Sequence, residues 1–416
     1  MNSTGLRATC CVAGGGPAGI MAGCLLARAG VRTIVLERHR DFFRDFRGDT
    51  IHPSTLQLMH ELGLLDAFLK LPHEKIRSLR VRVGDTEIQV ADFSHLPTVC
   101  KYIALMPQWD FLNFLAEQGR RYPGFELHME TEATDLIVEG DRVVGLRGQS
   151  PDGPIEIRAD LVIGADGRHS TVRERAGFQV TNLGAPMDVL WMRLSRHPND
   201  PEQTGGFVNY GHLFVTLNRG DYWQCAFVIR KGGYDAVREH GLDAFRAEIV
   251  KLAPYLAERV HELKDWDDIR LLTVEVDRLT QWWRPGLLCI GDAAHAMSPI
   301  GGVGVNLAVQ DAVAAANILA IPLREGRLTT ADLAAVQRRR TFPMKVVQGM
   351  QIAVQSRIVD PLLDSDKPMT APWAMRLFNY FPFLRRIPAR IVGIGVRPEH
   401  VHSPQRDSPV GALAQS

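Results

Sequence analysis

The sequence predicts an α/β protein with three parts: a Rossmann-like three-layer domain, an antiparallel β-sheet domain inserted into it, and a C-terminal helical region. A strand that runs directly into a glycine-rich turn and a helix indicates the first part. Strand-like segments clustered between residues 178 and 276 indicate the second, and a largely helical remainder after residue 330 forms the third. The expected boundaries are 1–75, 101–177 and 278–340 for the Rossmann-like domain, 76–100 and 178–277 for the sheet domain, and 341–416 for the helical region with its disordered tail.

The glycine-rich turn has the spacing of a dinucleotide-binding fingerprint, Gly14-x-Gly16-x-x-Gly19. Gly14 would make the tight turn, and Gly16 would let the backbone approach a pyrophosphate. Gly19 would let the following helix pack close to the strand. The N-terminus of that helix, with Pro17 and Ala18, would face the anion.

Glu37 ends the next strand, at the position of the acidic residue that binds the adenosine ribose. Arg38 follows it and leaves a ribose 2′-phosphate as an alternative. An exposed arginine is common after the acidic residue, so an unphosphorylated ribose is favoured.

The other elements follow from periodicity and turn residues. Helical spacing of apolar residues predicts a helix within 41–68, and alternation at 76–90 predicts a hairpin that turns at Gly84-Asp85. Further predicted elements are a helix at 109–119, a strand pair within 127–146, strands at 161–165, 189–194, 212–217, 222–229 and 287–291, and helices at 242–252 and 305–320.

Composition disfavours several classes of function. The formal net charge of +1 gives no general electrostatic attraction to nucleic acid. The six cysteines lie mostly in apolar segments and never as Cys-x-x-Cys, so we expect reduced core residues of a cytoplasmic protein. We expect neither a signal peptide nor an integral membrane segment.

Two further motifs follow later strands, Gly164-Ala-Asp-Gly-Arg-His-Ser170 and Gly291-Asp-Ala-Ala-His-Ala-Met-Ser-Pro299. In this order, and together with the glycine fingerprint, they resemble the group A flavin monooxygenases, the para-hydroxybenzoate hydroxylase-like family, over most of residues 8–345. The resemblance implies bound FAD and transient surface binding of NAD(P)H, because the chain has only one dinucleotide fingerprint.

The resemblance also implies roles for individual residues. Asp292 would accept a hydrogen bond from a ribityl hydroxyl of FAD, and Pro299 would lie beside flavin C4a as the catalytic-loop residue. Asp166 would serve both FAD and the nicotinamide, with a plain Asp-Gly turn as the alternative. The helix N-terminus after Gly301-Gly-Val-Gly304, the glycine loop, would stabilise negative charge on reduced flavin. The other FAD contacts would come from Arg47, Gln108, Gly291, Gly302, Gly304, Val305 and Asn306.

The implied reaction is hydroxylation of an electron-rich aromatic ring. NAD(P)H reduces FAD, reduced flavin adds O2 to give a C4a-hydroperoxide, and the distal oxygen passes to the substrate. One alternative is an FAD-dependent reductase of an isoprenoid or quinone-type substrate, and another is a non-enzymatic binder of aromatic ligands. Halogenation is disfavoured, because the sequence contains no Trp-x-Trp-x-Ile-Pro element.

The substrate pocket is expected between the inserted sheet and the loop at 299–304, which we call the flavin loop and which includes the glycine loop. Aromatic residues of the sheet would line it, and a sheet-core role for most of them is an equal alternative. Arg193 is the one candidate for binding a substrate carboxylate, and an exposed strand position is favoured for it. The aromatic content favours an apolar substrate of two or more fused rings. The proposed lining is Trp191, Phe207, Tyr210, Trp223 and Phe227, with Met192, Phe214 and Pro299 as further candidates.

Two remaining features are interpreted from spacing and charge. His52, His169 and His295 lack the spacing of metal ligands and are interpreted as structural or polar contacts, so no metal site is expected. Aromatic residues at 373–384 lie beside Arg385, Arg386 and Arg390. They could form a helix that lies on a membrane surface, but packing over the flavin domain or the substrate entrance is favoured, because Pro382 and Pro388 interrupt any long helix.

Overall fold

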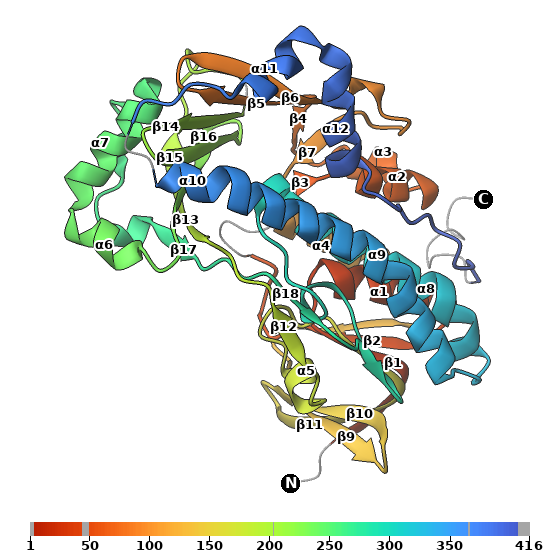
Figure 1. Cartoon of the computed structure of the whole chain (residues 1–416). Helices are drawn as coiled ribbons and strands as arrows, with labels where there is room; N and C mark the ends of the chain where they lie inside the picture. The colour runs from red at the N-terminus through yellow and green to blue at the C-terminus, as the bar shows by residue number, and fades with distance from the viewer. Residues whose placement is uncertain (1–3, 44–49, 203, 365–366, 407–416) are drawn as a thin grey trace.

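The structure is a computed structural model that describes residues 4–43, 50–202, 204–364 and 367–406 (Figure 1). Its elements form a mostly parallel sheet, a second, largely antiparallel sheet, and helices that connect the two. Arg47 and the predicted disordered tail at 407–416 lie outside the described residues.

The mostly parallel sheet carries the glycine fingerprint. Its strands lie in the order β19, β20, β11, β1, β2, β8. β1 pairs in parallel with β11 and with β2, while β9 and β10 form an antiparallel extension beside β11. The bounds are β1 Thr4–Ala13, β2 Thr33–Leu36, β8 Phe125–His128, β9 Glu132–Glu139, β10 Arg142–Ser150, β11 Gly153–Gly164, β19 Trp283–Arg284 and β20 Leu287–Cys289.

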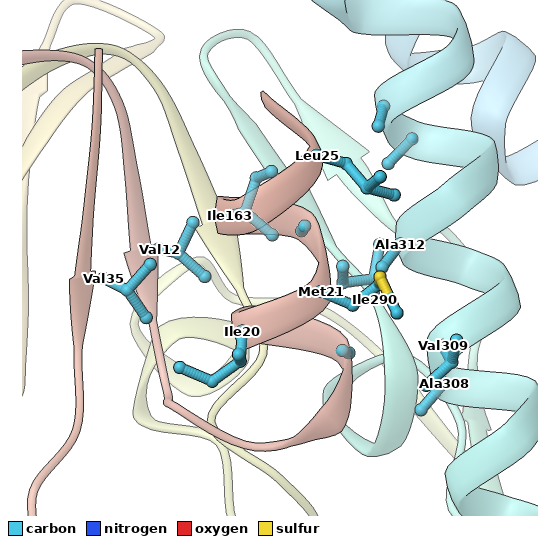
Figure 2. Packing of buried hydrophobic residues seen from close by; sticks show 14 of the residues in the cluster. Val12, Ile20, Met21, Leu25, Val35, Ile163, Ile290, Ala308, Val309 and Ala312 are labelled. Carbon is cyan, nitrogen blue, oxygen red and sulfur yellow. The ribbon is translucent and has the colours of Figure 1, made fainter. Parts of the chain in front are cut away.

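Helix α1 (Pro17–Arg28) lies between this sheet and helix α8 (Gly304–Arg324) (Figure 2). Figure 2 shows Ile20 pointing toward the strands and Met21 toward α8. Small residues such as Ala308 and Ala312 let the two helices approach closely, and all of these side chains are buried. Helix α4 (Gln108–Arg120) packs beside α1.

The helical segment Ile300–Arg324, which contains α8, is long and apolar enough to cross a membrane. However, 72% of its most apolar window is buried inside the protein. Buried core helices meet the same criteria of length and composition, and α8 packs against α1 on one side and α9 on another. We therefore interpret α8 as a core helix.

The second sheet has the strand order β17, β13, β16, β15, β14, β5, β6. Its neighbours are antiparallel except β14 and β5, which pair in parallel, so the expected purely antiparallel sheet is corrected at this one pairing. The predicted hairpin is present, with its turn at Gly84-Asp85. The bounds are β5 Ser78–Val83, β6 Thr86–Asp92, β13 Met187–Ser195, β14 Gly205–Asn209, β15 His212–Asn218, β16 Tyr222–Arg230 and β17 Arg270–Leu272.

Each face of the second sheet is covered. Helices α6 (Tyr234–Glu239) and α7 (Leu242–Leu252) lie on what we call the outer face, over a core that includes Leu190 and Phe227. On the inner face, Val189 and Val228 pack in a cluster that also holds Ile300, next to the fingerprint domain. Since side chains alternate along a strand, residues one apart in β13 belong to different cores.

The C-terminal region leaves the first domain and covers the second (Figure 1). Helix α9 (Thr330–Val354) continues through a π-helical turn at Gln355–Val359 into α10 (Asp360–Leu363), which contacts β15 and β16. Helices α11 (Trp373–Tyr380) and α12 (Arg386–Gly393) then lie over β6.

Smaller elements connect these parts. A three-stranded sheet forms from β3 (Thr50–Ile51), β7 (Ile103–Leu105) and β4 (Glu74–Ile76). The short strands β12 and β18 pair near the crossover between the two domains. Their bounds, with those of the short helices, are β12 Val180–Asn182, β18 Asp277–Leu279, α2 Pro53–Glu61, α3 Leu65–Phe68 and α5 Thr171–Arg175.

Candidate active site

The three sequence motifs meet at the carboxyl ends of β1, β11 and β20. A Cβ on Gly14 would lie 2.3 Å from the Ala165 carbonyl oxygen, so the fingerprint turn abuts the Asp166 motif. A Cβ on Gly291 would lie 3.0 Å from the Ala18 Cβ. The Asp292 motif therefore contacts the first turn of α1. Carboxyl ends of parallel strands are where ligands of open α/β sheets bind.

The three fingerprint glycines have different surroundings. Gly14 has a positive φ of 101°, which suits the tight turn. A Cβ on Gly19 would lie 1.9 Å from the Gly14 carbonyl oxygen, which explains the close helix–strand contact. Gly16 is the N-cap of α1, and a Cβ there would meet no described atom within 4 Å. No described side chain caps this helix, so its N-terminus is open to an anion.

Glu37 stands at the end of β2, next to the fingerprint turn. Its carboxylate accepts hydrogen bonds from the backbone N–H groups of Gly15 (3.1 Å) and His39 (3.0 Å). These bonds hold the carboxylate beside the turn, as expected of a ribose acceptor. Arg38 is exposed and its Nε lies 3.0 Å from His39 Nε2.

Asp166 has a local hydrogen-bonding role. It accepts bonds from the Ser170 hydroxyl (2.5 Å) and the Val172 N–H (3.1 Å), at the start of α5. Burial raises the pKa of Asp166 above its usual value, although these bonds act in the opposite direction. The geometry thus matches the Asp-Gly turn that was the alternative interpretation, with Gly167 at a φ of 87°.

Asp292 makes the link between two motifs. Arg168 Nε donates to its carboxylate at 3.2 Å, and the Asp292 side chain keeps 33% of its surface exposed. A half-exposed carboxylate at a strand end can accept a further hydroxyl donor, as predicted for the ribityl chain. Asp292 accepts no capping bond from the short helical turn at Gly291–Ala293.

The glycine loop before α8 is joined to the segment that begins at Thr50. Thr50 Oγ1 donates to the Gly302 carbonyl oxygen at 2.9 Å, and a Cβ on Gly302 would lie 2.4 Å from this hydroxyl. Asn306 Oδ1 accepts from the His52 N–H (2.8 Å) and the Thr55 hydroxyl (2.7 Å). Asn306 therefore has a positioning role within the protein.

Three glutamines of α9 and the π-helical turn hold the backbone on both sides of Pro299. Gln351 Nε2 donates to the carbonyl oxygens of Ser298 and Ile300, both at 2.9 Å. Gln355 donates to the Ser298 hydroxyl at 2.8 Å, and Gln348 to the Ala296 carbonyl oxygen at 3.1 Å. These residues were not predicted from the sequence. Their spacing of three and four on one helix face, in a buried stripe, is the signal that could have found them.

A buried charge cluster lies behind the Asp292 motif. Asp311 accepts from the Gly291 N–H (3.1 Å), His295 Nε2 (2.6 Å) and Arg340 Nε (2.8 Å). Burial alone would raise the pKa of Asp311, but His295 and Arg340 outweigh it and hold this pKa below its usual value. Arg340 also pairs with Glu399 at 3.2 Å. The cluster ties the motif to α8, α9 and the C-terminal segment.

The family model for the FAD binding domain matches residues 7–350 of this chain. The chain belongs to this family of FAD-dependent aromatic monooxygenases. It is 33% identical over 392 residues to 6-methylpretetramide 4-monooxygenase of Streptomyces rimosus, with 92% of each chain covered. It is 30% identical to 12-dehydrotetracycline 5-monooxygenase/anhydrotetracycline 6-monooxygenase of Streptomyces rimosus subsp. rimosus, over 73% of this chain and 60% of that relative.

Solved structures agree on the fold. The crystal structure of PqsL, a probable FAD-dependent monooxygenase from Pseudomonas aeruginosa, superposes with a TM-score of 0.74 at 22% identity, covering 86% of this chain and 98% of that one. The expected fold class, FAD as the cofactor and monooxygenase as the enzyme class are therefore confirmed.

The residues of this flavin monooxygenase fit FAD at the motif junction. Three features suit the adenosine diphosphate half of FAD: the open N-terminus of α1, the free space in front of Gly16 and the position of Glu37. Gln108 begins α4, directly after the small sheet that contains Thr50. Gly304 begins α8 and Val305 follows it; no described side chain caps this end. The individual FAD contacts stay predictions.

The structure corrects most of the expected substrate lining. Trp223 and Phe227 are buried in the outer-face core, where Trp223 Nε1 donates to Asp200 at 2.8 Å. Phe207 packs on the same side, and its ring centroid lies 6.2 Å from that of Tyr255. Tyr210 sits in the β14–β15 turn with a φ of 49°. The further candidates Met192 and Phe214 also lie in the outer core. These side chains point away from the flavin domain.

Trp191 and Pro299 lie on the other side. Trp191 packs against the inner-face cluster, which also includes Ile300, the residue after Pro299. His52 Nδ1 donates to the Val392 carbonyl oxygen (2.7 Å), and His295 contacts Asp311, so both have the structural contacts predicted for them. Within the described residues, no group of three His, Cys, Asp or Glu is placed to hold a metal ion. All six cysteines are buried and free.

Proposed function

We propose that this monooxygenase uses NAD(P)H and O2 to hydroxylate an apolar aromatic substrate of two or more fused rings. The observation that carries the proposal is the inner face of the second sheet, where Trp191 and the cluster around Val189 and Val228 meet Ile300 of the flavin loop. Val189 and Val228 are buried, but Trp191 is only half-buried, and an aromatic surface beside this loop suits a flat apolar ring system.

Charge on the inner face supports an uncharged substrate. Arg193 is the nearest basic position along β13, two residues beyond Trp191. Its guanidinium stacks 3.8 Å from the Tyr222 ring centroid and lies 3.8 Å from the Asp221 carboxylate. It is thus engaged at the surface, in agreement with the favoured exposed position. A polar hollow of about 410 Å³ there includes Asp221, Glu262, Asp267 and Asp268, which makes it unsuited to an apolar ring.

The names of the relatives support the same substrate class. The relatives described above are monooxygenases of 6-methylpretetramide and of anhydrotetracycline. Bound FAD would supply electron transfer and oxygen activation. The chain would hold the ring system and exclude water. Gln351 and Gln355 would keep the Pro299 backbone in place, and the N-terminus of α8 would stabilise negative charge by its dipole. Free, buried cysteines support the proposal of a reducing, cytoplasmic setting.

Labelled oxygen tests the reaction. The FAD-loaded protein is incubated with NADH or NADPH and a panel of phenols, quinolones and polycyclic quinones, and NAD(P)H oxidation is followed. We expect stimulation by a true substrate, and one labelled atom from ¹⁸O2 in the product. Label from water instead of O2 would contradict the proposal. Product that forms equally well without O2 would favour the reductase, and binding without turnover of any compound would favour the non-enzymatic binder.

A second measurement tests how the flavin is reduced. In the family that the sequence resembles, substrate binding accelerates reduction by moving the ring between a buried and an exposed position. We expect stopped-flow reduction by NAD(P)H to be slow alone and faster with substrate. A rate that is indifferent to a true substrate would contradict this gating and leave the hydroxylation proposal standing.

A further inference from the structure

Helix α11 has one face that packs and one that is exposed. Met375 and Phe378 pack in a cluster with Val83 and Ile88 of the β5–β6 hairpin. These contacts place the packed face of α11 on the second sheet and not over the flavin domain, which the favoured interpretation named; a position over the substrate entrance stays a prediction. Trp373 and Tyr380, however, are 77% and 75% exposed. Of the aromatic side chains of α11, Phe378 therefore packs against the protein, whereas Trp373 and Tyr380 do not.

The exposed apolar surface continues into the next turn and α12. Phe381, Phe383 and Ile387 are 48%, 59% and 59% exposed, and the two phenylalanine rings lie 6.0 Å apart. We call Trp373, Tyr380, Phe381, Phe383 and Ile387 the aromatic patch. It belongs to α11 and α12, at the end of the molecule opposite β9 and β10 (Figure 1). A cluster of large exposed apolar side chains on a folded protein marks a contact surface.

The chain segment that carries the aromatic patch has charges of a single sign. Residues 367–398 contain six Lys and Arg and no Asp or Glu, although the whole chain has a net charge of only +1. Arg376, Arg386 and Arg390 of this segment are exposed. On the adjacent strand β6, Glu87 is already paired with Arg80 at 3.0 Å and with Arg82 at 3.7 Å.

We propose that the aromatic patch is a peripheral membrane-contact surface that binds anionic lipid. Trp and Tyr favour the headgroup level of a bilayer, and Phe and Ile favour the acyl chains beneath it. Arginines beside them would meet the negative lipid surface. A basic segment without a single acidic residue matches the uniformly negative surface of an anionic bilayer. The proposal does not depend on the reaction that the enzyme catalyses.

Vesicle flotation with the full FAD-loaded chain tests the proposal. Vesicles of phosphatidylcholine alone are compared with vesicles that also contain phosphatidylglycerol. We expect co-flotation with the anionic vesicles, weakened by added salt. The double variants Trp373→Ser/Phe383→Ser and Arg386→Glu/Arg390→Glu should each partition roughly tenfold less. All of these side chains are exposed, so FAD absorbance and Tm should stay at the wild-type values.

Matched controls come from helix α9. Phe342 is 55% exposed and Arg338 is exposed, so Phe342→Ser and Arg338→Glu change the same residue types on another surface. These variants should float like the wild type. Wild-type protein that binds neither vesicle, or double variants that bind as well as the controls, would overturn the proposal. So would light scattering that shows a wild-type dimer and monomeric patch variants without vesicle binding, because the patch would then join two copies of this chain.

Discussion

Arg168 donates its Nε to the Asp292 carboxylate at 3.2 Å, and so joins two loops that are 124 residues apart in the sequence. The fingerprint turn lies against the first of these loops and α1 against the second. Substitutions at this junction therefore test which individual residues bind FAD.

We expect Asp292→Ala to weaken FAD binding roughly 10- to 100-fold, because a hydrogen bond to a charged acceptor contributes about 1.5–3 kcal/mol. The measurement is the Kd from quenching of FAD fluorescence by the apoprotein. Asp152→Ala, in the exposed turn between β10 and β11, is the control and should bind as the wild type does. Unchanged affinity of Asp292→Ala would remove the ribityl role from this residue.

Substitutions at two glycines of the fingerprint should have different effects on stability and on FAD binding. Gly16→Ala places its Cβ in open space at a φ of −72°, so the apoprotein should keep its free energy of unfolding within about 0.5 kcal/mol. FAD affinity should nevertheless fall, because the methyl group would occupy the approach of the pyrophosphate. Gly19→Ala instead places its Cβ 1.9 Å from the Gly14 carbonyl oxygen, which should destabilise the apoprotein by about 1–3 kcal/mol.

Urea denaturation measures the free energy of unfolding of both variants, and FAD titration measures their affinity for the cofactor. Equal loss of stability in the two variants would mean that Gly16 is also a packing position. Full FAD affinity of Gly16→Ala would place the pyrophosphate elsewhere.

Gln351→Leu should disturb the loop that carries Pro299 without touching substrate. It removes two donors to the buried carbonyl oxygens of Ser298 and Ile300, each of which costs about 1–3 kcal/mol when left unpaired. We expect a larger share of NAD(P)H oxidation to end as free H2O2, at a nearly unchanged rate of flavin reduction. Gln149→Leu, at an exposed position of β10, is the control and should leave the coupling of NAD(P)H oxidation to hydroxylation unchanged. A variant that loses stability but keeps tight coupling would limit Gln351 to a folding role.

Two tryptophans on opposite faces of the second sheet give a matched pair. Trp191→Ala on the inner face should raise the KM for the aromatic substrate, because it removes apolar surface beside the flavin loop. Trp223→Phe on the outer face removes the donor to Asp200 and should cost about 1–3 kcal/mol of stability with an unchanged KM. The reverse pattern would show that substrate binds on the outer face.

His52 should make stability depend on pH. Burial lowers its pKa from 6.5 to about 4, although the bond to the Val392 carbonyl oxygen raises it. Between these values the unfolded chain binds a proton that the folded protein does not, so the free energy of unfolding should fall as the pH is lowered from 6.5 to 4. The slope from this residue is at most about 1.4 kcal/mol per pH unit.

His52→Asn keeps a donor near the Val392 carbonyl oxygen and cannot titrate. Its urea midpoint should therefore vary less with pH in this window than that of the wild type. Identical slopes in the two proteins would show that folding does not lower the pKa of His52.

The sequence by itself determined the local features of the cofactor domain. The fingerprint, Glu37 and the two later motifs predicted strand ends and tight turns, and these depend on spacing and on glycine geometry, which a short segment contains in full. The helix at 242–252 and the hairpin turn at Gly84-Asp85 were also predicted from periodicity, and both are present. The same patterns sufficed for the family resemblance.

Only the tertiary structure decided which face of the second sheet is directed toward the flavin loop. Alternation in β13 shows that Trp191 and Met192 point in opposite directions, but both faces of this sheet are covered and apolar. No local pattern distinguishes them. For this reason the sequence left Trp223 and Phe227 between a pocket role and a sheet-core role, and the structure places both in the outer-face core. The role of Gln351 was likewise decided by a helix that packs 53 residues away in sequence from Ser298, because a hydrogen bond to a distant backbone leaves no trace in the residues beside it.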